Sequence, residues 1–330
     1  MDISFSTPVV NLKTSNGYGH AASQVLDSLK RLGHNVPFQD ARAKVQLNFS
    51  QPVYYKLHRN QYQISYTPWE STVIPKEWFE YLDHCDEVWT TSNWCKEVFE
   101  ANGIKDVKVY PHGIDPMWRP KKRNIEHGRP IKFLHVGEPA PRKAGQMVVD
   151  AFIALYGNNP FYSLTIKAYG HNTTRVYDNY IDKSIIGVPN EKFSNIKLIT
   201  EELSNEELVK LYHDHDVLIY PSYGEGFGFI PFQALATGMP VICTDGWAHY
   251  NDYLGPLKLR SELIDSPWPV HQGKVFEPEY NHLVELMRDV SINYNAYAGY
   301  YFAQSTKLHQ EYNWDRLTNK AFGHIFKKFS

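Results

Sequence analysis

The chain has 330 residues, which is long enough for two domains and for a core that needs no disulfide or metal to stabilise it. Its composition, 42% hydrophobic and 21% charged, excludes a chain that is disordered throughout. The 34 basic and 36 acidic residues give a formal charge of -2, which disfavours a protein that binds nucleic acid by charge alone.

The cysteines and the N-terminal residues indicate the compartment. Cys85, Cys95 and Cys243 are too few for a secreted disulfide framework, and their spacing is not that of a zinc site. The chain starts without the basic and apolar pattern of a signal peptide, and it contains no apolar run long enough to span a membrane. We therefore expect a reduced, cytoplasmic protein. Its aromatic content of 15% is typical of core packing, although rings also stack on sugars and bases.

Strand and helix patterns alternate along the first 110 residues, which favours an α/β fold. Apolar residues recur at helical spacing from Ala21 to Leu32, and Gly33 provides a stop signal. The remaining elements expected here are strands at 45–49, 63–66, 87–92 and 107–110 and a helix at 93–102.

Residues 116–130 combine proline, glycine and charge without apolar periodicity, which is typical of a linker. A second alternating series follows. Its expected strands lie at 131–136, 164–168, 196–199, 217–220 and 241–244, and its expected helices lie at 144–155, 205–213, 230–236 and beyond 280. We therefore predict two doubly wound α/β halves that face each other across a cleft, with a ligand at the carboxyl ends of the strands.

The most informative segment is YPSYGEGFGFIP at 220–231, which joins an expected buried strand to a helix. Gly224, Gly226 and Gly228 let the backbone approach a ligand, and the first amides of the following helix can bind phosphate. Glu225 adds a carboxylate that accepts hydrogen bonds from hydroxyls. The alternative is a tight strand-to-helix turn with a solvated glutamate.

A second strand-to-helix loop follows Gly137. In it, Arg142 offers a planar fork of donors and Lys143 a point charge, which together suit a diphosphate. The alternative is two solvated charges in front of a helix.

A third glycine loop, at 16–20, contains Gly17 and Gly19 and precedes a helix. The three loops together predict one polyphosphate ligand at which they converge. No Walker A pattern is present, and Gly17 and Gly19 lack the third glycine of a dinucleotide fingerprint, which disfavours a kinase and a Rossmann dehydrogenase.

These motifs, in this order, resemble those of glycosyltransferase family 4, a retaining family with the GT-B fold, over about residues 15 to 310. Part of the pattern is similar to a bacterial and phage branch of that family. The residues that carry the resemblance are 70–72, Trp78, 86–89, 111–115, 142–145, 221–228 and 234–242.

The resemblance implies a transferase that moves a sugar from a UDP- or GDP-linked donor with retention at the anomeric carbon, without a metal or another cofactor. Arg142 and Lys143 would neutralise the leaving diphosphate, and Glu225 would bind hydroxyls of the donor sugar. The implied donor-binding residues are Gly17, Gly19, Gly137, Gly226, Phe227, Gly228 and Gln233.

Three histidines compete for a place beside the transferred sugar. The resemblance favours His112, with His20 and His84 as rivals, and the alternative for His112 is a turn residue that bonds to backbone. Glu70 and His20 are the implied acceptor contacts.

Two positions depart from the family pattern. Gln233 stands where the family carries a second glutamate for the ribose, and Glu138 stands where many relatives carry arginine. A glutamine accepts a hydroxyl hydrogen bond but has no charge. These departures support an alternative function, a nucleotide-sugar-binding module with weak or no catalysis.

We expect residues 1–120 to form the acceptor half and 121–304 the donor half, with 305–330 packing back on the first half. The expected acceptor is a glycan, a lipid-linked glycan or a hydroxymethylated base in phage DNA. The basic run 119–123 would contact DNA phosphates, or else it is a solvated linker. Residues 322–328 mix aromatics with lysines, and they would pack on the protein or touch a membrane surface.

Overall fold

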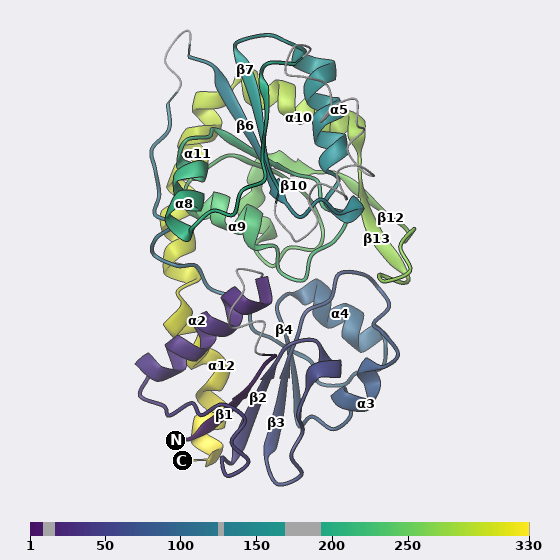
Figure 1. The fold of residues 1–330 in the computed structure, drawn as a ribbon, viewed down its shortest axis with the longest axis vertical. Coiled ribbons are helices and arrows are strands. Elements are labelled where there is room, and N and C mark those ends of the chain that lie inside the picture. Colours follow the sequence, from purple (N-terminus) through teal and green to yellow (C-terminus); the bar gives the residue numbers. More distant parts are fainter. Residues whose placement is uncertain (9–16, 125–128, 169–192, 330) are drawn as a thin grey trace.

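The computed structural model describes residues 1–8, 17–124, 129–168 and 193–329. Its strands form one sheet of five strands, one of six strands and a two-stranded hairpin. Figure 1 shows the two larger sheets in separate halves along the long axis, with both chain ends at the lower end. The predicted architecture of two doubly wound α/β halves is confirmed.

The N-terminal sheet is parallel throughout, in the order β1-β2-β3-β4-β5. Its strands are β1 (Ile3–Ser6), β2 (Val45–Phe49), β3 (Tyr62–Tyr66), β4 (Glu87–Thr90) and β5 (Lys108–Val109). Its helices are α2 (Gly17–Arg31), η1 (Pro52–Tyr54), α3 (Trp78–Leu82) and α4 (Asn93–Ala101). Helix α4 starts where the sequence predicts, because the side chain of Ser92 accepts a hydrogen bond from the amide of Cys95.

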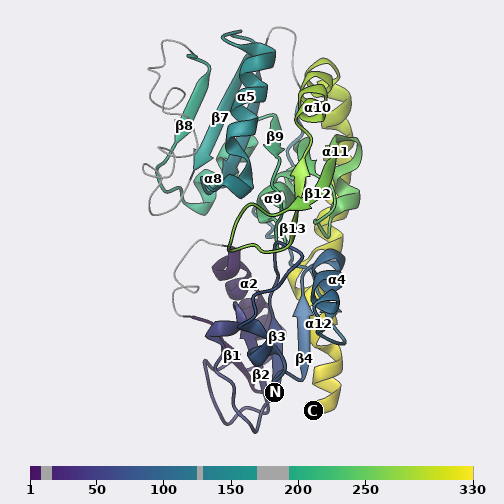
Figure 2. The same ribbon diagram turned by 90° about the vertical axis from the view of Figure 1, so that its right-hand side faces the viewer.

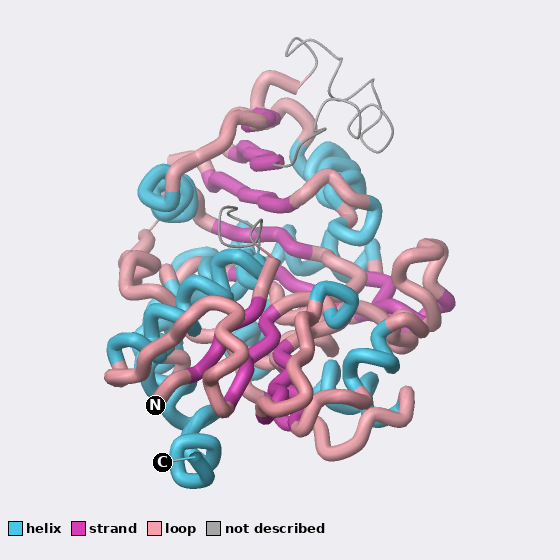
Figure 3. The backbone as a smooth tube through the Cα atoms, turned by 60° about the horizontal axis from the view of Figure 1, so that its bottom comes forward, coloured by secondary structure: helices cyan, strands magenta, loops and turns pink. Residues whose placement is uncertain are grey.

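The C-terminal sheet is also parallel, in the order β11-β10-β9-β6-β7-β8, and helices lie on both sides of its strands (Figure 3). Its strands are β6 (Ile131–Gly137), β7 (Tyr162–Ala168), β8 (Ile196–Ile199), β9 (Val217–Tyr220), β10 (Val241–Thr244) and β11 (Lys258–Leu259). Its helices are η2 (Pro141–Lys143), α5 (Gly145–Tyr156), α8 (Asn205–His213), α9 (Phe229–Ala236), η3 (Asn251–Leu257), α10 (Tyr280–Ile292) and α11 (Tyr294–Glu311).

Two features differ from the sequence prediction. Helix α2 begins at Gly17 rather than at Ala21, so the predicted glycine loop is already helical at Gly17 and Gly19. The second difference is an antiparallel hairpin of β12 (Ser261–Asp265) and β13 (Lys274–Pro278), which no periodic pattern indicated. In Figures 1 and 2 the loop of this hairpin reaches toward the N-terminal half.

The linker is held against the C-terminal half. The side chain of Arg123 is buried, and it donates to the backbone carbonyls of Tyr212, His215 and Thr237. Burial lowers the pKa of Arg123 to about 10. Arg129 pairs with Asp216, with 2.7 Å between guanidinium nitrogen and carboxylate oxygen. Neither expectation for the basic run, contact with DNA phosphates or a solvated linker, holds at Arg123, because its donors are used inside the protein.

The chain returns to the N-terminal half in its last helix, α12 (Trp314–Phe329). Phe322 and Ile325 are buried in the same cluster as β1 and β2, and the ring centroid of Phe322 lies 4.9 Å from that of Trp89. Figure 2 shows α12 running down beside β4. The apolar face of residues 322–328 therefore packs on the protein. Trp118 packs in the core of the C-terminal half. The domain boundary expected near residue 120 stays a prediction.

The α12 contact leads to a stability prediction. Phe322→Ala removes a buried ring, and we expect it to lower the free energy of unfolding by about 3–5 kcal/mol. Urea unfolding followed by circular dichroism measures the change. The matched control, Lys320→Ala, removes an exposed side chain of the same helix and should change stability by less than about 0.5 kcal/mol. Equal effects of the two variants would contradict the described packing of α12.

Candidate active site

Two loops meet at the carboxyl edge of the C-terminal sheet. Strands β6 and β9 are parallel neighbours, so the segments that follow them emerge at the same edge. The amide of Tyr223 donates to the carbonyl oxygen of Arg142 at 2.9 Å. This hydrogen bond joins the loop after β9 to the loop after β6, as the convergence predicted from the sequence requires.

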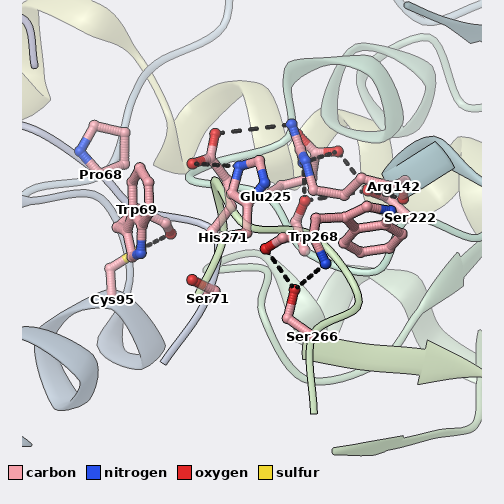
Figure 4. Close-up of polar contacts among 12 residues, drawn as sticks. Pro68, Trp69, Ser71, Cys95, Arg142, Ser222, Glu225, Ser266, Trp268 and His271 are labelled. Carbon is pink, nitrogen blue, oxygen red and sulfur yellow. Dashed lines mark hydrogen bonds and ion pairs between the residues drawn. The ribbon is translucent and has the colours of Figure 1, made fainter. Parts of the chain in front are cut away.

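Four donors surround one oxygen of Glu225. Its Oε1 lies 2.5 Å from Lys143 Nζ, 2.6 Å from Ser222 Oγ and 2.8 Å from Tyr220 Oη. Arg142 Nη1 approaches the same oxygen at 3.2 Å. Figure 4 shows Glu225 facing Arg142 and Ser222. Glu225 is therefore not a solvated turn residue, and the alternative interpretation of this loop is wrong for its side chain.

The charges at this point shift the pKa values of one another. Burial alone would raise the pKa of Glu225, but Lys143 and Arg142 outweigh burial and lower it to about 2. Burial and the neighbouring Arg142 lower the pKa of Lys143, an effect that Glu225 partly offsets. Burial also opposes the charge of Arg142, yet Glu225 and Glu70 hold the pKa of Arg142 above its ordinary value. Glu225 and Arg142 are thus ionised at neutral pH.

The glycines of the loop allow close contact with the other half of the protein. A Cβ at Gly224 would lie 2.3 Å from the carbonyl oxygen of Glu70, and one at Gly226 would lie 2.5 Å from Cβ of Pro68. The hydroxyl of Thr91 donates to the carbonyl of Gly226. The sequence predicts that these two glycines make room for a ligand. In the structure, the 68–70 segment of the protein itself occupies the space beside them.

The next part of the loop prepares the start of α9. Gly228 adopts a φ of 79° and forms the N-cap of the helix, and Phe227 beside it is buried. Gln233, eight residues after Glu225, is buried within α9. Glu138 is exposed directly after β6.

Three predicted donor-binding glycines, Gly17, Gly19 and Gly137, lie outside the 220–228 loop. A Cβ at Gly137 would lie 3.7 Å from Cγ of Lys143, so this glycine borders the lysine side chain. A Cβ at Gly17 would lie 3.8 Å from the ring of Phe229, the first residue of α9. Gly19 is buried in the first turn of α2, and residue 16 of the same predicted loop lies outside the described residues.

The histidine candidates separate into two groups. His112 and His20 both contact Phe229, with ring centroids at 5.2 Å and 4.9 Å. His112 is buried, its Nδ1 lies 3.2 Å from Tyr66 Oη, and burial lowers its pKa to about 3, so the ring is neutral at neutral pH. His84 is exposed, and its Nδ1 contacts the carbonyl of Glu80 in its own segment. The structure therefore brings His112 and His20 together and leaves His84 apart.

His20 and Glu70 each have a charged neighbour. His20 Nε2 lies 3.2 Å from a carboxylate oxygen of Asp115. Glu70 lies beside Arg142, with 3.9 Å between Oε1 and Nη2, and beside His271, with 3.7 Å between Oε2 and Nε2. No sequence pattern marks His271, because the hairpin that carries it has no periodic signal.

Comparison with known proteins gives the family. The model for glycosyl transferases group 1 matches residues 118–290, more than half of the chain. The chain belongs to this family. A relative described as putative glycosyltransferase 45, from Sulfolobus islandicus filamentous virus (isolate Iceland/Hveragerdi), is 23% identical over 297 residues, which cover 81% of this chain and 78% of the relative.

Other similar proteins match the second half or the fold. A D-inositol 3-phosphate glycosyltransferase of Corynebacterium efficiens is 28% identical over 145 residues, covering 42% of this chain and 32% of that protein. Sucrose-phosphate synthase from Thermosynechococcus elongatus superposes with a TM-score of 0.69 at 15% identity, over 99% of this chain and 98% of that one. HepE of Anabaena, solved with UDP-glucose, gives a TM-score of 0.72 at 10% identity, over 99% of both chains. The fold is that of the GT-B glycosyltransferases.

In the described ranges no helix is both long enough and apolar enough to cross a bilayer.

The site predicts a specific dependence of stability on pH. The pKa of Glu225 is lowered in the folded state from 4.5 to about 2, so its contribution to stability is present above the unfolded pKa and lost as the pH falls. Glu225→Gln should be less stable than wild type at pH 7, because Lys143 and Arg142 lose their counter-ion. The difference in unfolding free energy between wild type and Glu225→Gln should narrow as the pH falls from about 5 toward 2.

Urea unfolding at a series of pH values measures that gap. The exposed Glu97→Gln, in α4, is the matched control and should follow wild type at every pH. A gap between wild type and Glu225→Gln that stays constant with pH would contradict the described pairing.

Proposed function

We propose that this protein transfers a glycosyl group from a nucleotide-sugar donor to a hydroxyl acceptor, with retention at the anomeric carbon. The observation that carries the proposal is the meeting of Arg142, Lys143 and Glu225 at the carboxyl edge of the C-terminal sheet. Ligands of open α/β sheets bind at that edge. The arrangement supplies two cations for a diphosphate and one carboxylate for sugar hydroxyls.

The cations would act on the leaving group. When the bond between sugar and phosphate breaks, negative charge develops on the diphosphate, and groups already in place stabilise that charge better than water does. Arg142 and Lys143 are such groups, since hydrogen bonds to Gly224 and Glu225 hold both in position. The amides of Gly226, Phe227 and Gly228, in the loop that leads into α9, would add hydrogen bonds.

Glu225 has a free face for the donor. In the described part of the chain, its contacts with Lys143, Ser222 and Tyr220 all fall on Oε1. Its Oε2 is therefore the oxygen that we assign to the hydroxyls of the donor sugar. Gln233, buried in α9 eight residues after Glu225, would accept a hydrogen bond from the ribose.

Retention would follow from attack on the face that the diphosphate leaves. The acceptor oxygen forms a bond to the anomeric carbon while the bond to the phosphate oxygen breaks, and that phosphate oxygen takes the proton of the acceptor hydroxyl. The neutral, buried His112 and the half-exposed His20 would line the sugar's side of this reaction. Protein cations would supply the charge that metal ions supply in other transferases.

The similar proteins guide the choice of substrates. HepE was solved with UDP-glucose, and one relative is described as a D-inositol 3-phosphate glycosyltransferase, so UDP-glucose and D-inositol 3-phosphate belong among the substrates to be tested. We propose a UDP- or GDP-linked sugar as donor and a glycan, a lipid-linked glycan or a hydroxymethylated base of DNA as acceptor. Transfer to DNA would fall steeply with salt, whereas transfer to a small glycan would not.

The decisive test is transfer or hydrolysis of radiolabelled UDP- and GDP-sugars. We expect Lys143→Ala and Glu225→Ala each to lower kcat by about 10²–10³, because each removes a preorganised charge from the site. The exposed Lys210→Ala is the control and should retain wild-type turnover. Binding of a nucleotide sugar without turnover, across the whole panel of acceptors, would support a catalytically inactive binding module instead.

A further inference from the structure

Arg142 is contacted by carboxylates from both halves of the protein. On one side its Nη1 lies 3.2 Å from Glu225 and donates to the carbonyl of Gly224. On the other side its Nη2 lies 3.9 Å from Oε1 of Glu70, which comes from the loop after β3. The cation proposed for the diphosphate therefore already faces an anion from the N-terminal half.

The second oxygen of Glu70 faces the hairpin of the C-terminal half. His271 Nε2 lies 3.7 Å from Oε2 of Glu70, and the ring of His271 lies 5.4 Å from that of Trp69. Figure 4 shows His271 between the Trp69 segment and Arg142. Among the described residues, each oxygen of Glu70 thus has one ion-pair partner, and the two partners come from different loops.

Main-chain contacts hold this arrangement in place. The amide of Thr72 donates to the carbonyl of Lys274 at 3.0 Å, and the amide of Lys274 donates to Thr72 Oγ1 at 2.6 Å. A Cβ at Gly273 would lie 2.4 Å from Thr72 Oγ1, so only glycine fits at this approach. These contacts hold the β12–β13 hairpin against the 70–73 segment, which keeps His271 beside Glu70.

The environment keeps Glu70 charged. Burial would raise the pKa of Glu70, but the contacts with His271 and Arg142 outweigh burial and lower it. Glu70 is thus an anion at neutral pH. An incoming diphosphate and this carboxylate carry the same sign of charge and compete for the same guanidinium.

We propose that Glu70 is an exchangeable counter-ion for Arg142: it neutralises the guanidinium when the donor is absent and yields it to the diphosphate when the donor binds. His271 keeps its contact with the other oxygen of Glu70 and stabilises the carboxylate after the exchange. This inference rests on the proposed donor site. In this proposal Glu70 acts at the donor site, and acceptor binding by Glu70 is the competing role that the test distinguishes.

The test is calorimetric titration of the full chain with UDP and with GDP. Glu70→Gln keeps the shape of the side chain and removes the competing charge, so we expect nucleotide binding about fivefold tighter than in wild type. In an Arg142→Gln background, the same change should alter affinity by less than about twofold, because the shared partner is gone. Tighter binding is not a result that damage to the fold would give.

A second variant tests His271. His271→Gln removes the partner that receives the displaced carboxylate, and we expect nucleotide binding about threefold weaker, with no effect in a Glu70→Gln background. The exposed Glu77→Gln, on the same half as Glu70, is the matched control and should bind like wild type. Thermal unfolding checks that every variant is folded.

The outcomes separate the inference from the proposed function. Unchanged or weaker nucleotide binding in Glu70→Gln would overturn the counter-ion role, and a raised acceptor KM with unchanged nucleotide affinity would assign Glu70 to the acceptor. An unchanged nucleotide affinity in His271→Gln would overturn the proposed role of His271 in stabilising the displaced carboxylate of Glu70. Wild-type protein that binds neither nucleotide, nor any sugar derivative of them, would overturn the donor site and the inference together.

Discussion

The buried contact between Lys143 and Glu225 is the interaction on which the loops at the carboxyl edge of the C-terminal sheet depend. A single buried ion costs several kcal/mol, so each of these charges requires the other to stay inside. Their contact ties the loop after β6 to the loop after β9 and fixes the approach to α9. Because Arg142 shares Glu225 and also meets Glu70, the same set of charges extends to the N-terminal half. Charged side chains of both halves thus meet at the carboxyl edge of the C-terminal sheet.

Most of the fold could be predicted because its elements carry local signals. Helix α4 has its serine N-cap and its glycine stop, and the buried strands of the C-terminal sheet are short apolar runs between turn residues. The start of α2 was misplaced because glycine has a low helix propensity, yet Gly17 and Gly19 are helical in the tertiary structure. The β12–β13 hairpin was missed because β12 lacks strict alternation and its faces are mostly exposed.

The candidate site could be predicted as far as its residues follow strands of one sheet. Arg142, Lys143 and Glu225 were found in this way, because parallel neighbours end at the same edge. The contacts between the halves could not be found. The approach of Glu70 to Arg142 joins residues from different sheets, and His271 reaches Glu70 only through a hairpin with no sequence signal. Such contacts depend on how the halves pack, which periodicity does not encode.

A crystal structure of the full chain with bound UDP or GDP is the direct test of the proposed donor site. We expect diphosphate oxygens within hydrogen-bond distance of Lys143 and Arg142 and of the amides at the start of α9. A nucleotide bound elsewhere, with the Lys143–Glu225 contact intact and facing away from it, would contradict the account.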